Sequence, residues 1–184
     1  MRKGIGIDLD SVTCESYDYL IHLGKGFFKK EPVNIGLYNT GRIFEVSEAE
    51  NNAFWNAITP SYYETVPAKE NARDTIKRLS EKADIFFITS RPKSLKKETL
   101  RWLIKNGMSD FPFSVIHTTK KEEACRRMGI DVMVEDEPDF IQAVSGVTDV
   151  IAFAYPYNVD VRRRSKVHSA SSWAEVENLI SEIL

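Results

Sequence analysis

The feature that most constrains this chain is a short apolar run, within residues 3–12, that ends in two carboxylates. Residues 4–9 are apolar or small apart from Asp8, and the run is too short for a typical helix. Such a run predicts a central strand of a parallel sheet. Asp8 then stands at the carboxyl end of this strand, where open α/β sheets place their ligands. Asp10 follows two residues later, so an extended backbone directs both carboxylates to one side.

Two carboxylates this close repel each other, which raises the pKa of each above the ~3.9 of a free aspartate. A hard divalent cation would relieve the repulsion, and oxygen ligands of this kind suit Mg²⁺. The pair alone leaves two interpretations open, a metal site or a strand end whose acids are simply solvated. The rest of the chain has to decide between them.

Length and composition narrow the class of protein. The 184 residues fit one domain, or one domain with a small insertion, and can bury a sizeable core. The formal net charge of -2 gives no reason to expect a nucleic-acid polymer or a membrane surface as a partner. Cys14 and Cys125 form no metal-binding pattern, and no secretory or membrane-spanning stretch is present, so we expect a cytoplasmic protein with reduced thiols.

Residues 13–67 differ in composition from the residues after them. They are rich in aromatic side chains and show no convincing strand pattern. Ser47 and Glu50 form a capping-box signature ahead of a helical face, and residues 61–64 form a weaker one between Pro60 and Pro67. We therefore expect a small helical insertion after the first strand, with an irregular loop at about residues 24–46.

From residue 68 onward, apolar strands alternate with amphipathic helices. The strands are expected at residues 84–89, 113–116, 131–136 and 147–154, and the helices at residues 72–83, 92–107, 119–129, from 138, and 173–183. The helix at residues 119–129 would open with a capping box at Thr119. Residues 155–170 are expected to form a loop. This alternation predicts an α/β fold, in which a parallel sheet has helices on both faces.

Three of the predicted strands end in polar side chains. Asp8 and Asp10 follow the first, Thr89 and Ser90 end the second, and Glu135 and Asp136 end the fourth. A lysine pair, Lys120 and Lys121, opens the helix after another strand. In a parallel sheet all carboxyl ends share one edge, so these groups can converge on one site. A response-regulator receiver domain uses similar groups, but it needs an aspartate on its third strand that is missing here.

The order of these groups resembles the four motifs of the haloacid dehalogenase (HAD) superfamily of phosphohydrolases. Residues 8–12 resemble the first motif, Thr89 the second, Lys120 the third with Lys121 as the alternative, and residues 135–139 the fourth. The resemblance implies a Rossmann-like three-layer α/β/α sandwich. It also implies a catalytic core at residues 1–12 and 68–184, with residues 13–67 as a helical cap.

The resemblance further implies roles for individual residues. Asp8 would be the nucleophile that forms an aspartyl-phosphate, and Asp10 the general acid and base. Thr89, Ser90 and Lys120 would bind the phosphate. Mg²⁺ would be the cofactor, held by Asp8, by the backbone carbonyl of Asp10 and by Asp136, with Glu135 contacting it directly or through water.

A narrower resemblance points to the 5′(3′)-deoxyribonucleotidase group. It rests on the short aromatic cap, on Thr89-Ser90, and on the tail motifs at residues 156–158, 162–164 and 172–173. It implies a nucleoside monophosphate as the small phosphomonoester substrate, with homodimer formation left open. The candidates for contact with the nucleobase are the cap residues Phe54, Trp55, Tyr62 and Tyr63.

Two other functions compete with a nucleotidase. The first is a phosphatase for a sugar phosphate or another small metabolite, which would differ only in what the cap presents. The second is a binding module that keeps the fold without catalysis. The complete set of acids, hydroxyl and lysine argues against the second.

Overall fold

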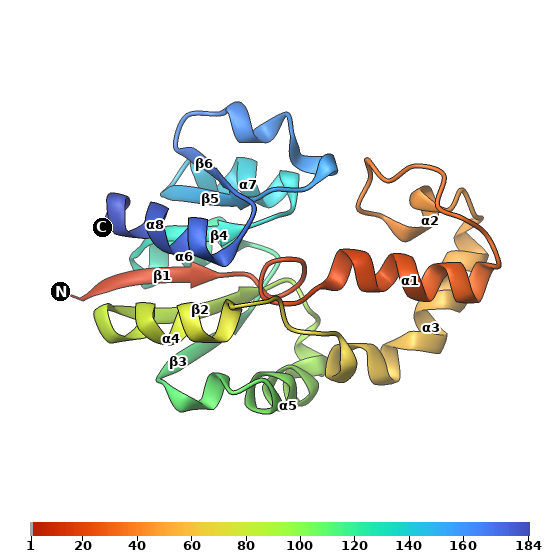
Figure 1. The fold of residues 1–184 in the computed structure, drawn as a ribbon, viewed down its shortest axis with the longest axis horizontal. Coiled ribbons are helices and arrows are strands. Elements are labelled where there is room, and N and C mark those ends of the chain that lie inside the picture. The colour runs from red at the N-terminus through yellow and green to blue at the C-terminus, as the bar shows by residue number, and fades with distance from the viewer. Residues whose placement is uncertain (1) are drawn as a thin grey trace.

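The computed structural model describes residues 2–184, and for Pro60 it describes the backbone alone. At its centre lies one six-stranded sheet of order β3-β2-β1-β4-β5-β6, in which all neighbouring strands are parallel (Figure 1). The strands are β1 (Lys3–Ile7), β2 (Ala83–Thr89), β3 (Phe113–His117), β4 (Ile130–Glu135), β5 (Asp149–Phe153) and β6 (Val167–Ala170). The predicted α/β fold class is confirmed.

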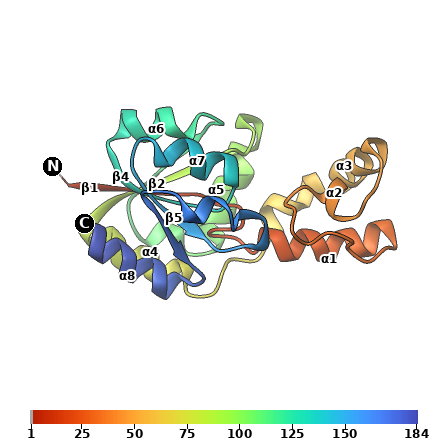
Figure 2. The same ribbon diagram turned by 90° about the horizontal axis from the view of Figure 1, so that it is seen from above.

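Helices cover both faces of the sheet. Helices α4 (Ala72–Lys82) and α8 (Trp173–Ile183) lie on one face, and α6 (Lys121–Met128) and α7 (Pro138–Ser145) on the other (Figure 2). Helix α5 (Lys96–Lys105) packs its buried Trp102 and Leu103 into the same core as α4 and α8. The result is a three-layer sandwich.

The strand residues alternate between two hydrophobic cores. Ile5 and Ile7 of β1 belong to the core beneath α4 and α8, whereas Val150 and Ala152 of β5 belong to the core beneath α6 and α7. Because both faces of the central strands are covered, these strands read as continuous apolar runs in the sequence. This is why the run before Asp8 is a reliable sign of a buried parallel strand.

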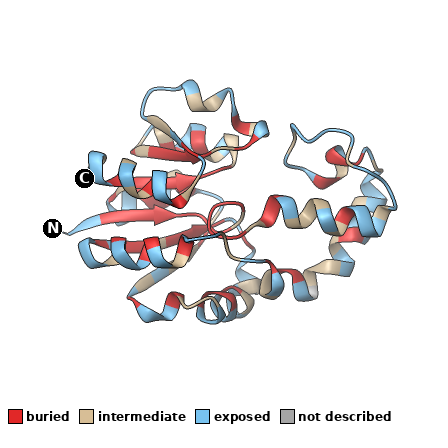
Figure 3. Ribbon diagram, viewed as in Figure 1, coloured by how far each residue is buried: buried red, intermediate tan, exposed pale blue. Residues whose placement is uncertain are grey.

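The remaining helices are α1 (Ser16–Phe28), α2 (Thr40–Ile43) and α3 (Glu48–Thr65), which form a helical segment beyond the carboxyl edge of the sheet (Figures 1 and 2). Its two connections to the sandwich run side by side. Cys14 and Ala68 form an antiparallel bridge, and the Glu15 amide donates to the Pro67 carbonyl at 2.8 Å. Figure 3 shows that burial is concentrated in the strands and that the outer turns of the helices are exposed.

The helical segment matches the predicted helices in part. The capping box of α3 is confirmed, because Ser47 and Glu50 exchange side-chain and backbone hydrogen bonds. The weaker box at residues 61–64 does not start a second helix, since α3 runs through Pro60 without a break. Helix α1 extends to Phe28 and α2 lies inside the expected loop.

Two expectations outside the helical segment were wrong. Residues 155–170 are not only a loop, because β6 pairs in parallel with β5 at the edge of the sheet. Short 3₁₀ turns, Pro156–Asn158 and Val161–Arg163, precede it. The capping box at Thr119 is also absent, since α6 has Lys120 at its N-cap position and begins at Lys121. Among the described residues, the helices are too short or too polar to cross a membrane.

Two glycines of α1 provide a matched test of packing in the helical segment. A Cβ added at Gly24 would lie 2.4 Å from the ring of the buried Phe44, whereas one added at Gly26 would meet nothing within 4 Å. Both substitutions gain the helix propensity of alanine, about 0.5–1 kcal/mol. We expect Gly26→Ala to raise the free energy of unfolding in urea by this amount. Gly24→Ala should lower it by about 1–3 kcal/mol, because the site is overpacked. Equal effects at both positions would contradict this packing.

Candidate active site

The candidate active site lies at the carboxyl edge of the sheet, between β1 and β4. Asp8 directly follows β1, and its amide donates to the Val134 carbonyl of β4 at 3.0 Å, which brings it beside Glu135 and Asp136. The strand order reverses between β1 and β4, because the connections from β1 lead one way to β2 and β3 and the later strands lie on the other side. Ligands of open α/β sheets bind at such a point.

Three carboxylates gather at this point. Asp8, Glu135 and Asp136 are buried, and each offers an oxygen within 4.8 Å of those of the other two. Burial, together with repulsion from Glu135 and Asp10, raises the pKa of Asp8 to about 7, although the charge of Lys121 opposes this. Burial and the charges of Glu135 and Asp8 likewise raise the pKa of Asp136 well above its ordinary value. A hard divalent cation, bound by oxygen ligands, fits this donor set and would offset the repulsion.

The lysine that reaches these acids is Lys121. Its Nζ lies 2.7 Å from Asp8 Oδ1 and 2.7 Å from Glu135 Oε2, and its side chain is only 1% exposed. Although burial lowers the pKa of Lys121, the charges of Asp8 and Glu135 raise it above its ordinary value, so the ammonium is retained.

Lys120, the first choice from the sequence, lies elsewhere. It points into solvent with a 68% exposed side chain and pairs with Glu123 at 3.0 Å. The structure therefore corrects the assignment by one residue, in favour of the alternative lysine. The physical reason is the start of α6: successive residues at a helix terminus point in different directions, and only Lys121 is directed toward the sheet edge.

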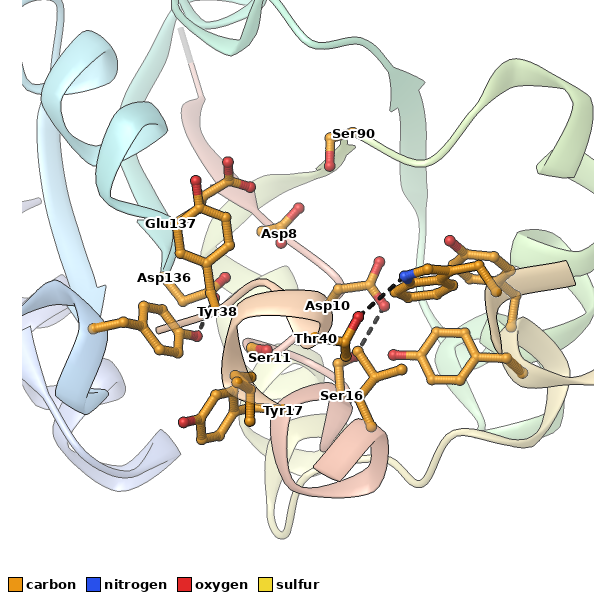
Figure 4. A pocket seen from close by; sticks show the side chains of 16 residues that line it. Asp8, Asp10, Ser11, Ser16, Tyr17, Tyr38, Thr40, Ser90, Asp136 and Glu137 are labelled. Atoms are coloured by element: carbon orange, nitrogen blue, oxygen red, sulfur yellow. Dashed lines mark hydrogen bonds between the residues drawn. The ribbon is translucent and has the colours of Figure 1, made fainter. Parts of the chain in front are cut away.

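Asp10 lies apart from the acid cluster and is paired with Arg91. Arg91 Nε lies 2.7 Å from Asp10 Oδ2 and Nη2 lies 2.8 Å from Oδ1, while Ser16 Oγ donates to Oδ1 at 2.9 Å. Figure 4 shows the bond from Ser16 at the wall of the cavity. Burial raises the pKa of Asp10, but the charge and hydrogen bonds of Arg91 and the bond from Ser16 outweigh it and lower the pKa overall. Sequence reasoning missed Arg91, although it directly follows the Thr89-Ser90 motif.

Thr89 and Ser90 occupy the end of β2, as predicted. Thr89 is fully buried, and its hydroxyl accepts the Arg91 amide at 3.2 Å. Its carbonyl accepts the Thr118 amide at 2.9 Å. Ser90 lines the cavity opposite Asp8 (Figure 4). Thr89 therefore shapes the turn after β2, while Ser90 presents its side chain to the cavity.

A cavity of about 290 Å³ opens between the sheet edge and the helical segment. Asp8, Asp10, Asp136 and Glu137 lie on the sheet side (Figure 4). The other walls are largely aromatic and hydroxyl-bearing, and they include Ser16, Tyr17, Tyr38, Thr40, Trp55, Tyr62, Tyr63 and Tyr157. Such a cavity can hold a phosphate at the acids together with a flat organic group beside the rings.

The four predicted specificity residues separate into two sets. Trp55, Tyr62 and Tyr63 line the cavity. Phe54 does not, because it is fully buried against Phe27 and Phe28, with ring centroids 5.5 and 5.1 Å away. Phe54 therefore belongs to the aromatic core of the helical segment, and the prediction of a substrate contact there is not supported.

Tyr157 is a second residue at the site that received no role from the sequence. Its hydroxyl donates to Asp136 Oδ2 at 2.5 Å, and its ring stacks on Tyr155 with centroids 5.0 Å apart. Tyr155 in turn donates to the carbonyl of Ser11, whose φ of 61° lies in the left-handed region. The turn after Asp10 thus takes a conformation that glycine adopts more easily. The stacked rings of Tyr155 and Tyr157 connect this turn to Asp136.

Comparisons with known proteins agree with this fold. A haloacid dehalogenase-like protein of Agrobacterium tumefaciens superposes with a TM-score of 0.72 at 12% identity, covering 100% of this chain and 99% of that one. This likeness shows the fold of the HAD class. The family model described as 5′ nucleotidase, deoxy (pyrimidine), cytosolic type C protein matches residues 2–184, and the chain belongs to this family.

Curated relatives carry nucleotidase names. A Bacillus cereus protein named "Putative nucleotidase" is 23% identical over 189 residues, covering 96% of this chain and 97% of the relative. A nucleotidase of Clostridium acetobutylicum is 26% identical over 140 residues, covering 75% and 72%. The predicted superfamily is confirmed, and the chain is a phosphomonoesterase of the HAD superfamily with a small phosphate ester as its substrate.

The two lysines at the start of α6 give a direct test of the site geometry. Lys121→Met leaves Asp8 and Glu135 buried without their shared cation. We expect it to lower the free energy of unfolding, measured in urea at pH 8, by about 3 kcal/mol, the cost typical of breaking a buried ion pair. Lys120→Met should leave stability unchanged, because its partner is exposed. The assignment of Lys121 is wrong if the two variants are equally stable.

Proposed function

We propose that the chain hydrolyses nucleoside monophosphates through a covalent aspartyl-phosphate on Asp8. The observation that carries the proposal is the position of Asp8, at the sheet edge between the buried ammonium of Lys121 and a cavity with aromatic walls. A carboxylate held in this way can attack phosphorus, and a buried cation can stabilise the charge that develops.

The reaction divides between Asp8 and Asp10. Asp10 first takes up a proton, against the influence of Arg91, which lowers its pKa. The Asp8 carboxylate then attacks phosphorus, the bond from phosphorus to the leaving oxygen breaks, and Asp10 gives that oxygen this proton. Asp10 then takes a proton from water as the water attacks the phosphorus, and the acyl-phosphate bond breaks to restore Asp8. The single ammonium of Lys121 balances Asp8 throughout, and Ser90 and the turn after Thr89 contribute phosphate contacts.

Mg²⁺ is the cofactor that we propose. Asp8, Asp136 and the backbone carbonyl of Asp10 would hold it, with Glu135 contacting it directly or through water. The ion would neutralise charge on the phosphate and on the acid cluster. The raised pKa of Asp8 and of Asp136 supports a cation at this place. Tyr157 fixes the orientation of Asp136 by its hydrogen bond.

The helical segment supplies the substrate preference in this proposal. Residues 13–67 act as a cap over a core of residues 1–12 and 68–184, and closure of the cap excludes water from Asp8. A nucleobase stacks on the rings of Trp55, Tyr62 or Tyr63, which line the cavity. The family description, which contains the words nucleotidase, deoxy and pyrimidine, and the names of the relatives support a nucleotide over a sugar phosphate.

The proposed nucleophile is tested by Asp8→Asn with Asp84→Asn as the control. An amide is a far weaker nucleophile and metal ligand, so we expect Asp8→Asn to release no phosphate from nucleoside monophosphates or from p-nitrophenyl phosphate. Asp84 lies at the exposed start of β2, so Asp84→Asn should leave activity unchanged.

Wild-type activity should vanish in EDTA and return with Mg²⁺, and excess Ca²⁺ should inhibit because it takes more ligands at longer distances. Full activity of Asp8→Asn, or of the wild type in EDTA, would refute the mechanism or the metal.

The proposed substrate is tested by Trp55→Ala with Phe54→Leu as the control. Stacking of a base on an aromatic side chain contributes ~1–3 kcal/mol, so loss of Trp55 should reduce kcat/KM for a nucleoside monophosphate by about ten-fold or more. Hydrolysis of p-nitrophenyl phosphate should change much less. Phe54→Leu should alter stability and leave the ratio of the two activities unchanged.

Faster wild-type turnover of sugar phosphates than of nucleotides would favour the metabolite phosphatase instead.

A further inference from the structure

Arg91 is an enclosed cation that pairs with Asp10, and its two bonds to that carboxylate are the least expected feature of the site. The side chain is 1% exposed, and its guanidinium approaches Asp10 with Nε and Nη2 side by side at 2.7 and 2.8 Å. This two-pronged geometry fixes the plane of the carboxylate as well as its position. With Ser16 on Oδ1, both oxygens of Asp10 accept hydrogen bonds, which is the arrangement of the ionised carboxylate that receives a proton from water.

The remaining contacts of Arg91 join the sandwich to the helical segment. On the sandwich side, its amide donates to Thr89 Oγ1 and its carbonyl lies 3.0 Å from His117 Nδ1 at the end of β3. On the other side, its guanidinium lies 4.8 Å from the centroid of the Tyr63 ring in α3. Its Nη1 is buried and has no protein partner. The side chain is therefore held by two parts of the fold and aimed at Asp10.

Stability alone gives a weak reason for such an arrangement. A buried ion pair is often no better for stability than apolar residues of the same volume, and here one guanidinium nitrogen lacks a hydrogen bond. A role in placing Asp10 explains the same contacts directly, because the proton that Asp10 carries must reach one particular oxygen. Misplacement of a proton carrier by about 1 Å can cost about a hundred-fold in rate.

We propose that Arg91 is the positioning residue for Asp10. This inference rests on the proposed function, since it assigns a support to the residue that moves the proton. Arg91 itself touches neither the substrate nor the reacting atoms. When Arg91 is removed, Asp8 keeps its place and its partner Lys121, but proton transfer to the leaving group and from water is lost.

The choice of leaving group separates the loss of proton transfer by Asp10 from a loss of attack by Asp8. p-Nitrophenolate departs without a proton, so Asp8 can still be phosphorylated by p-nitrophenyl phosphate when Asp10 is misplaced. The alkoxide of a nucleoside needs a proton to depart. Hydrolysis of the phosphoenzyme requires Asp10 with either substrate. A defect confined to Asp10 therefore blocks the first step for the nucleotide but only the second step for the aryl ester.

The experiment is rapid-quench kinetics of Arg91→Met with saturating Mg²⁺. For p-nitrophenyl phosphate we expect a burst of nearly one p-nitrophenolate per enzyme, followed by slow turnover. For a nucleoside monophosphate we expect no burst and a first step slower than wild type by about a hundred-fold. Arg78→Met is the matched control, because Arg78 makes the same paired bonds to Glu177 at 2.8 and 2.6 Å far from the site. It should behave as the wild type.

The outcomes distinguish the two proposals. Equal losses with both substrates, or a burst amplitude reduced in proportion to activity, would show a structural role for Arg91 and overturn the inference. Wild-type rates in Arg91→Met would overturn it as well. A wild-type enzyme that releases no phosphate from any ester would overturn the proposed function instead. If Arg91→Met fails to fold, Arg91→Lys keeps the charge but not the fork, and it should show the same selectivity to a smaller degree.

Discussion

The site depends on one buried ammonium placed between two buried carboxylates. Lys121 lies 2.7 Å from both Asp8 and Glu135, and Asp136 adds a third acid to the same enclosed space. One cation cannot balance three carboxylates away from water, which is why the pKa of Asp8 and of Asp136 rises. This imbalance is the physical reason to expect a second, divalent cation, which would help to bind a phosphate at the end of β1.

Asp8 and Asp10 show how two identical side chains acquire different chemistry from their surroundings. Burial and neighbouring acids raise the pKa of Asp8 to about 7, whereas Arg91, acting against burial, lowers that of Asp10. The proposed roles require Asp8 to be ionised, which a divalent cation would favour, and Asp10 to take up a proton against the influence of Arg91. The separation comes from different elements: Lys121 belongs to α6, while Arg91 follows β2 and contacts α3.

The sequence predicts the fold well where burial leaves a pattern and poorly where it does not. The central strands are buried on both faces, so their apolar runs, and the acids that end them, are visible in the sequence. Strand β6 leaves no such pattern because it is a short edge strand, in which His168 is half-buried and Ser169 is exposed. The sequence favours Lys120 over Lys121 because hydrophobic periodicity does not define the first residue of a helix to within one position. Arg91 received no role and Phe54 the wrong one, since their roles depend on contacts between segments distant in the sequence.

The contacts of Arg91 connect the helical segment, which lines the cavity, to Asp10. Segments inserted into a sandwich fold can change their seating when they are held by few connections, and here two adjacent backbone crossings at Cys14 and Ala68 join the parts. Ser16 lies at the start of α1 and Tyr63 near the end of α3, and each touches Asp10 or its partner. A shift of this segment would therefore change the surroundings of Asp10 while leaving Asp8, Lys121 and Glu135 in place on the sheet. In the proposed mechanism the nucleophile Asp8 therefore belongs to the sandwich, and the proton carrier Asp10 lies at the boundary between the sandwich and the helical segment.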